Sequence, residues 1–302
     1  MEKVLEISHL SKKFGHQYAL NDVNLTIRKG DVYGLIGKNG AGKTTLIKVI
    51  TQLIQETDGS VSLFSSTNRS QWTQDLKRVG SVIESPVAHK HMTAYQNLVY
   101  YCKARHIPNP DQVIKETLNY VGLNNTGKKK FRDFSLGMKQ RLGIAIALIA
   151  KPDFLILDEP INGLDPVGIK EFRQMIKRLN DELGMTILIS SHILSELYLV
   201  ANRFGIVDQG RLIKEISKAE FEEQGEDYII LKTSQLALAS QLIQDQLHHR
   251  IKVIDKDGEI HIFGQTHDIK VIVKALVQAD IDVDEIYYAR QDLEKFFTDL
   301  VD

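Results

Sequence analysis

The sequence is poor in cysteine and contains no long hydrophobic run. Cys102 is the only cysteine, so no disulfide can form within the chain, and this fits a reducing compartment. Apolar stretches such as Ile144–Ala150 and Phe154–Leu157 fall far short of the ~20 residues that a bilayer-spanning helix needs. The N-terminal MEKVLEISHL has no apolar signal core. These absences predict a chain that is soluble, or held at a membrane only by a partner.

No excess of charge of either sign marks the sequence. Its formal net charge is −1, with 25% charged and 43% hydrophobic residues, which is ordinary for a globular protein. No net field therefore draws the chain to nucleic acid or acidic lipid. The basic run Lys128–Lys130 has no aromatic stacking pattern beside it, and it predicts a solvated connection rather than a nucleic-acid site. The 302 residues are enough for about two domains.

Strand and helix patterns alternate through the first two thirds of the chain. Short strands are predicted at Asp31–Ile36, Arg78–Ile83, Phe154–Leu157 and Thr186–Ser190, followed by a hairpin at 204–214. Helices are predicted at Gly42–Leu53, at Ala94–Arg105 after a capping box that begins at Thr93, from Ser135 to Ala150, and from Asp165 to Leu183. This alternation predicts an α/β fold with a largely parallel, covered sheet.

The pattern restarts after Glu223–Glu226, which predicts a linker. Beyond it we expect a strand, a helix, a hairpin, a helix, a strand and a last helix, at 227–232, 235–247, 251–263, 268–279, 283–289 and 292–301. The order βαββαβ is that of a ferredoxin-like unit. The sequence therefore predicts two domains, residues 1–222 and residues 223–302, of which the second is a small α+β domain.

A glycine-rich motif follows the first predicted strand. Gly37-Lys-Asn-Gly-Ala-Gly-Lys-Thr-Thr45 matches G-x-x-x-x-G-K-[ST], whose backbone N–H groups surround phosphates at the start of a helix. The predicted nucleotide-binding residues are Gly37, Lys38, Asn39, Gly40, Ala41, Gly42, Lys43, Thr44 and Thr45. Lys43 is expected to reach the outer phosphates and Thr44 to ligate Mg²⁺. Taken alone, the motif indicates only a nucleoside triphosphate.

Two acids end the apolar strand Phe154–Leu157. Ligands of α/β proteins bind at the carboxyl ends of strands, so Asp158 and Glu159 are candidate site residues. Asp158 is expected to hold Mg²⁺ through water, and Glu159 to act as the base for an attacking water. Capping of a helix is the alternative role, but Pro160 follows directly and no periodic helix begins there.

Three further motifs carry a resemblance to a known family. Phe134-Ser-Leu-Gly-Met-Lys-Gln-Arg141 resembles the ABC signature, Leu-Ser-Gly-Gly-Gln followed by Gln-Arg, with departures at Leu136 and Met138. Asn162-Gly-Leu-Asp165 resembles the D-loop, and Ser190-Ser-His192 resembles the switch-histidine motif. With the phosphate loop and the paired acids, these motifs resemble those of ABC ATPases in order and spacing over about residues 2–220.

The resemblance implies a phosphate-loop ABC ATP-binding domain with a helical subdomain at about residues 86–150. It also implies a head-to-tail dimer in which Ser135 and Gly137, with Asp165 of the D-loop, would serve nucleotide. His192 would orient the attacking water and contact the outer phosphate. The cofactors implied are ATP and Mg²⁺, and the reaction is ATP plus water to ADP plus phosphate.

Phe14 lies where the family stacks an aromatic ring on adenine. Tyr18 is the alternative, and packing of Phe14 in the core is the structural interpretation that the sequence leaves open.

Glu84 occupies a position where the family usually has glutamine, and the resemblance places it at the metal. The surrounding Gly80–Pro86, together with 134–138, Pro166–Glu171 and the tail Asp292–Phe297, resembles ATP-binding subunits of bacitracin-type exporters and lantibiotic-immunity transporters. This subgroup implies a separate integral-membrane permease, a second ATP-binding subunit, and a place at the inner face of the plasma membrane.

Three rival classes fit the motifs less well. ABC ATPases of DNA repair carry a long coiled coil between phosphate loop and signature, whereas here no sustained heptads separate Lys43 from Ser135. Translation-associated ABC proteins normally hold two ATPase cassettes, and this chain has one. A GTPase would carry Asn-Lys-x-Asp, which the sequence lacks.

Overall fold

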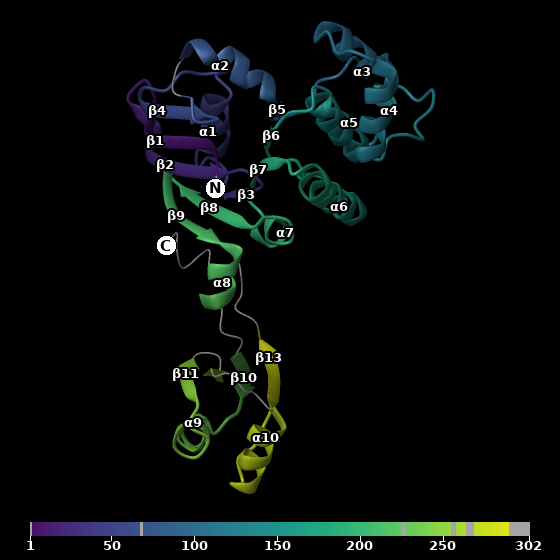
Figure 1. Ribbon diagram of the computed structural model, residues 1–302. Coiled ribbons are helices and arrows are strands. Elements are labelled where there is room, and N and C mark those ends of the chain that lie inside the picture. Colours follow the sequence, from purple (N-terminus) through teal and green to yellow (C-terminus); the bar gives the residue numbers. More distant parts are fainter. Residues whose placement is uncertain (1, 67–68, 225–227, 255–257, 264–268, 290–302) are drawn as a thin grey trace. The chain divides into compact units, whose positions relative to one another are not determined.

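The computed structural model describes residues 2–66, 69–224, 228–254, 258–263 and 269–289 (Figure 1). The chain divides into two compact units, the first ending at Lys218 and the second beginning at Ala219. Helix α8, Lys218–Gln224, starts at this division, and it includes the first two residues of the segment predicted as a linker.

A six-stranded sheet forms the centre of the first unit. Its order is β5 (Val79–Val82), β6 (Phe154–Leu157), β7 (Thr186–Ser191), β3 (Val32–Ile36), β8 (Arg203–Asp208) and β9 (Arg211–Ser217). The first five strands are parallel, and β9 pairs antiparallel with β8. Every residue of β3, β6 and β7 is buried, as expected for strands covered on both faces. The largely parallel sheet is confirmed, and its order sets the carboxyl ends of β6, β7 and β3 side by side.

A second sheet, which the sequence did not predict, is antiparallel and three-stranded. Its order is β2 (Gln17–Arg28), β1 (Lys3–Phe14) and β4 (Asp58–Leu63). The β1–β2 register shifts at several points, so the strands lack a clean apolar–polar alternation. A Cβ on Gly59 would lie 2.3 Å from the His9 carbonyl oxygen, so β4 requires glycine where it approaches β1.

Helices complete the first unit, and those predicted from sequence are confirmed. They are α1 (Lys43–Ile50), α2 (Arg69–Asp75), α3 (Ala94–Ala104), α4 (Pro110–Tyr120), α5 (Leu136–Leu148), α6 (Pro166–Leu183) and α7 (Leu194–Tyr198), with 3-10 turns η1 (Leu76–Arg78) and η2 (Phe131–Asp133). Thr93 forms the predicted capping box of α3 with Gln96. Helices α3, α4 and α5 gather on one side of the unit, away from α1 (Figure 1).

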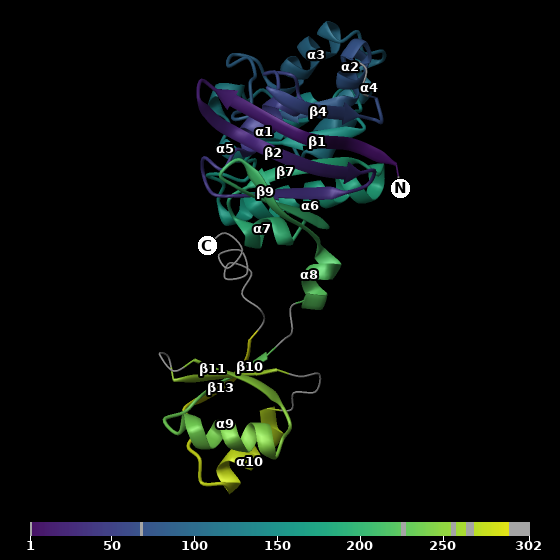
Figure 2. The same ribbon diagram turned by 90° about the vertical axis from the view of Figure 1, so that its left-hand side faces the viewer.

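The second unit has the ferredoxin-like order that the sequence predicts. Its elements are β10 (Tyr228–Lys232), α9 (Leu236–Asp245), β11 (Arg250–Ile254), β12 (Glu259–Phe263), α10 (Ile269–Gln278) and β13 (Glu285–Ala289). The sheet order is β11-β12-β10-β13, all antiparallel, and α9 and α10 lie on one face of it (Figure 2). Buried Ile229, Leu231, Ile260 and Ile262 pack against these helices. The predicted helix at 292–301 lies outside the described residues.

Candidate functional site

The phosphate loop joins β3 to α1 and packs tightly against neighbouring backbone. A Cβ on Gly37 would lie 2.4 Å from the Val207 carbonyl oxygen. Gly42 caps α1 at φ 111°, and a Cβ there would lie 2.8 Å from the Ala19 carbonyl oxygen. Both positions therefore demand glycine. The first-turn N–H groups of α1 meet no acidic residue in that turn, which suits an anion.

Lys43 lies within the loop and is almost fully buried. Its ammonium donates to the carbonyl oxygens of Gly37 at 2.6 Å and Lys38 at 3.3 Å. It also lies 3.0 Å from Glu159 Oε1, as an ion pair without the alignment of a hydrogen bond. The loop thus holds the Lys43 ammonium in place. The carboxylate of Glu159, the second acid after β6, partly offsets the positive charge of that ammonium.

Asp158 connects the phosphate loop to β7. Its carboxylate accepts hydrogen bonds from Thr44 Oγ1 at 2.9 Å and from Ser190 Oγ at 2.7 Å. The Ser190 hydroxyl in turn accepts from the backbone N–H of Glu159 at 2.8 Å. Sequence reasoning assigned no role to Ser190. The signal available was its place at the carboxyl end of a strand, next to His192.

Glu159 and His192 meet across the ends of β6 and β7. His192 Nδ1 lies 2.9 Å from Glu159 Oε2. Glu159 adopts φ 47°, an unusual conformation for a non-glycine residue that turns the chain sharply after the strand. Its side chain is 20% exposed, so it is reachable from the cavity beside it.

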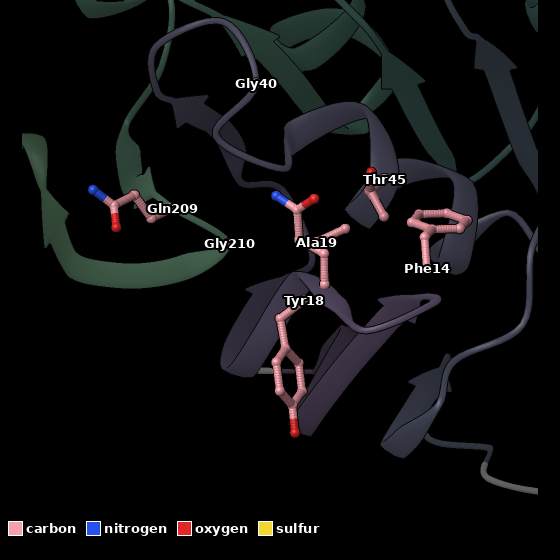
Figure 3. A pocket seen from close by; sticks show the side chains of 8 residues that line it. Phe14, Tyr18, Ala19, Gly40, Thr45, Gln209 and Gly210 are labelled. Atoms are coloured by element: carbon pink, nitrogen blue, oxygen red, sulfur yellow. The ribbon is translucent and has the colours of Figure 1, made fainter.

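Two cavities adjoin the phosphate loop. One, of about 200 Å³, is lined by Ala19, Glu159 and the loop residues Asn39, Gly40, Ala41, Gly42, Lys43, Thr44 and Thr45. The other, of about 640 Å³, shares Ala19, Gly40 and Thr45 with it and includes Phe14 and Tyr18 (Figure 3). Phe14 is 55% exposed, which rules out packing in the core. Its ring lies on the side of Thr45, whereas the ring of Tyr18 points away from the phosphate loop (Figure 3).

The comparisons with known proteins agree with this geometry. Residues 20–162 match the family model described as ABC transporter. The chain is 38% identical to the bacitracin transport ATP-binding protein BcrA of Enterococcus faecalis, over 100% of this chain and 97% of that protein. The chain belongs to the ABC transporter family. It is an ATP-binding subunit of such a transporter.

Other members of the ABC family extend the likeness. The lantibiotic transport ATP-binding protein SrtF of Streptococcus pyogenes is 47% identical over 70% of this chain and 90% of its own length. A solved ATP-binding subunit of an ABC transporter superposes with a TM-score of 0.65 at 28% identity, covering 73% of this chain and 92% of that one. In the part of the chain that the structure describes, no helix has the length and apolarity to cross a bilayer.

The residues that resemble the ABC signature and D-loop lie apart from the loop cavities. Ser135 caps α5 by accepting from the Met138 N–H at 3.3 Å, and Asp165 caps α6 by accepting from the Gly168 N–H at 2.7 Å. Neither of them, nor Gly137, lines either cavity beside the phosphate loop. Within one chain, then, the described residues bring together the phosphate loop, both acids, Ser190 and His192, but not the signature.

Glu84 also stands outside both cavities in the ABC subunit. Its Oε1 lies 2.5 Å from Lys48 Nζ, and its side chain is 63% exposed. Glu84, two residues beyond the end of β5, adopts φ 61°. Lys48 lies on α1, the helix that begins with Lys43, so the pair links the segment after β5 to the phosphate-loop helix. The sequence pattern did not predict a role for Lys48, because a lysine on a helix surface has no local feature that indicates its partner.

Proposed function

We propose that the chain binds ATP with Mg²⁺ and hydrolyses it to ADP and phosphate, and that this drives a separate membrane permease. One observation carries the proposal: a buried lysine, a threonine hydroxyl and two acids come together at the N-terminus of α1, beside the smaller cavity. The residues are Lys43, Thr44, Asp158 and Glu159, with His192 paired to the last.

Nucleotide would lie along the two adjoining cavities. The triphosphate would occupy the smaller one, where loop N–H groups and the Lys43 ammonium face it. The base would extend into the larger cavity, where the exposed Phe14 ring offers a flat apolar surface. We propose Phe14 rather than Tyr18 as the adenine contact, because Tyr18 points away from the loop (Figure 3).

The residues present fit Mg²⁺. Thr44 Oγ1 and the Asp158 carboxylate lie 2.9 Å apart and are hard oxygen donors, the kind that Mg²⁺ prefers. The described residues contain no cluster of three or more His, Cys, Asp or Glu that would hold a metal by themselves. Phosphate oxygens and water would supply the remaining ligands, and bound Mg²⁺ would offset the charge of the phosphates. Glu84, whose carboxylate pairs with Lys48, is proposed as a further ligand.

Glu159 is proposed as the base that takes a proton from the attacking water. Its Oε2 is held by His192, and its backbone N–H by Ser190, so the carboxylate has a defined direction. A triphosphate that pairs with Lys43 would displace the Glu159 carboxylate from the ammonium. Binding would thereby free Glu159 Oε1 to face water.

The site of a single chain lacks the signature, so we propose that a second subunit completes it. Ser135 caps the N-terminal turn of α5, and Gly137 lies within that turn, where a Cβ would meet only Leu164. These groups, with Asp165, would contact nucleotide held by the partner. The permease would place the pair at the inner face of the plasma membrane.

The cargo is proposed from the relatives. The names of two of them refer to bacitracin transport and lantibiotic transport. We propose that this subunit powers export of, or immunity to, an antimicrobial peptide.

The test compares Lys43→Ala with a matched control, Lys151→Ala, whose side chain is 72% exposed. Purified wild type and Lys151→Ala should hydrolyse Mg·ATP, and Lys43→Ala should lose turnover and bind ATP more weakly. Near-normal turnover of Lys43→Ala would overturn the site. For the cargo, expression with the cognate permease should raise resistance to bacitracin or a lantibiotic, and unchanged sensitivity to both would exclude that class.

A further inference from the structure

A buried amide on α5 reaches the segment that follows Glu159. The Gln140 side chain is 6% exposed, and its Nε2 donates a hydrogen bond to the Pro160 carbonyl oxygen at 3.2 Å. The two residues lie 20 positions apart in the sequence, so the contact joins α5 to the residue directly after Glu159. Gln140 lines neither cavity beside the phosphate loop.

Gln140 is the only polar residue among the buried residues of α5. The others are apolar residues or glycine: Leu142, Gly143, Ile144, Ala145, Ala147 and Leu148. Burying an amide costs free energy unless the amide is hydrogen-bonded, whereas an apolar side chain would pack here without that cost. The amide of Gln140 is therefore explained by its hydrogen bond to Pro160 and not by packing.

The Pro160 carbonyl belongs to the turn that directs the Glu159 carboxylate. Glu159 adopts φ 47°, and the Asn162 N–H donates to its carbonyl oxygen at 3.2 Å, which closes a turn with Pro160 at the second position. The Ser190 hydroxyl accepts from the Glu159 N–H at 2.8 Å. Pro160 has no N–H, so its carbonyl is the polar backbone group through which this residue can be held.

A positive φ at Glu159 persists only where the surroundings fix it. This conformation costs free energy for a non-glycine residue, and relaxation to a negative φ would change the direction of the side chain. The Ser190 contact fixes the backbone before the Glu159 side chain, and the Gln140 contact fixes it after. Without the second contact, the carboxylate would turn away from His192 and from the smaller cavity.

The same helix begins with the residues that resemble the ABC signature. Gln140 lies about one helical turn after Gly137. A Cβ on Gly163 would lie 2.9 Å from Leu136 Cδ2, so the start of α5 also packs closely on the segment beyond Pro160. The helix that is proposed to contact the partner's nucleotide is thus hydrogen-bonded to the turn that carries the proposed base of its own chain.

We propose that Gln140 is a positioning residue for Glu159. Its amide holds the Pro160 carbonyl and thereby keeps the Glu159 carboxylate directed at the attacking water while α5 contacts the partner's nucleotide. Gln140 touches neither nucleotide nor water in this role, so its loss should slow hydrolysis without weakening ATP binding. The role rests on the proposed hydrolysis, with Glu159 as its base.

The test changes the amide and keeps most of the side chain. Gln140→Met retains the length but has no donor, and Gln140→Asn retains an amide that is one methylene too short to reach Pro160. Both variants of the full chain should be about 10- to 100-fold slower in single-turnover hydrolysis of Mg·ATP, because a small misplacement of a reacting group slows a reaction steeply. Their ATP dissociation constants should stay within about twofold of wild type.

Two controls separate positioning from folding. Gln112→Met removes an exposed amide that donates to Glu116 at 2.6 Å on α4, and Ile144→Val trims a buried side chain of α5. Ile144→Val should lower the melting temperature, yet neither control should slow hydrolysis by more than about twofold. In Glu159→Gln, adding Gln140→Met should slow the residual reaction by less than about twofold, because the base that Gln140 positions is gone.

Wild-type turnover in both Gln140 variants would overturn the proposal. So would the same fold-loss in the wild-type and Glu159→Gln backgrounds, a parallel loss of ATP affinity, or failure of both Gln140 variants to fold, since each would assign Gln140 to the stability of the domain. Absence of hydrolysis by wild type would instead contradict the proposed function itself. Normal hydrolysis by wild type and by both variants would remove only the role of Gln140.

Discussion

Replacing Glu159 by glutamine should change hydrolysis and ATP binding in opposite directions. The substitution keeps the shape of the side chain but removes its charge and its capacity to take a proton. A positioned general base contributes about 10²–10⁴-fold, so the rate of hydrolysis should fall by that factor, equivalent to about 3–5 kcal/mol of barrier. The Ser190 hydrogen bond to the backbone N–H of residue 159 involves no side-chain atom of Glu159, so the turn after β6 should persist.

Binding should become tighter because the carboxylate competes with phosphate for the same ammonium. Lys43 Nζ lies 3.0 Å from Glu159 Oε1, and the two side chains are only 5% and 20% exposed. Two unit charges at this separation attract by about 5 kcal/mol at an effective dielectric constant of about 20, and the incoming phosphate recovers most of it. We expect Glu159→Gln to bind ATP about tenfold more tightly, equivalent to about 1.4 kcal/mol.

The assay pairs single-turnover hydrolysis with an ATP titration on the same preparation. Asp153→Asn is the matched control, because Asp153 is an exposed acid paired with Arg78 at 2.6 Å, outside both cavities. That variant should match wild type in both measurements. With ATP, Glu159→Gln should also accumulate as a dimer in gel filtration. Wild-type turnover in Glu159→Gln, or an ATP affinity that falls along with the rate, would refute both the base and the competition for Lys43.

Three further predictions follow from other parts of the chain. Glu84→Gln should leave ATP binding and basal turnover nearly normal and Glu84→Ala should lose more, while both reduce transport with the permease further than they reduce isolated ATPase rate; equal behaviour of wild type and both variants would remove the coupling role. Ending the chain after Glu223 should leave a folded ATP-binding unit, and an insoluble or non-binding product would show that the boundary is wrong. Burial raises the pKa of Glu215, whose carboxylate accepts a hydrogen bond from the Tyr33 hydroxyl at 3.0 Å. The folded state therefore binds a proton on the Glu215 carboxyl more tightly than the unfolded chain does. Stability from this group is therefore greatest below the ordinary value of 4.5 and falls as pH rises through the raised pKa, and Glu215→Gln should flatten that part of the pH–stability curve.

Local chemistry explains why many elements could be predicted from sequence. Asp165 followed by Pro166 marks the start of α6, and the structure shows Asp165 capping that helix. The glycines of the phosphate loop are needed because of close approach and a left-handed φ, constraints that glycine alone relieves. The apolar run Phe154–Leu157 could only be a buried strand, because it is short and followed by charged residues and proline.

Elements that depend on partners distant in sequence were not predictable in this way. Strands β1 and β2 form a sheet with β4, yet their register shifts obscure the alternation of side chains that a sequence pattern would need. Strands β1 and β2 are neighbours in sequence, whereas the pairing of β1 with β4 joins segments far apart in the chain and has no local signal.

The same distinction between local sequence and long-range contacts applies to the candidate site. The sequence by itself determined which residue types were available, since the loop motif, the paired acids and the switch histidine are each contiguous and chemically specific. Tertiary structure alone decided their contacts: it joined Ser190 to both Asp158 and Glu159, set Lys43 against Glu159, and tied Glu84 to Lys48. The physical reason is that parallel strands far apart in sequence end at one sheet edge, and only strand order determines which side chains meet there.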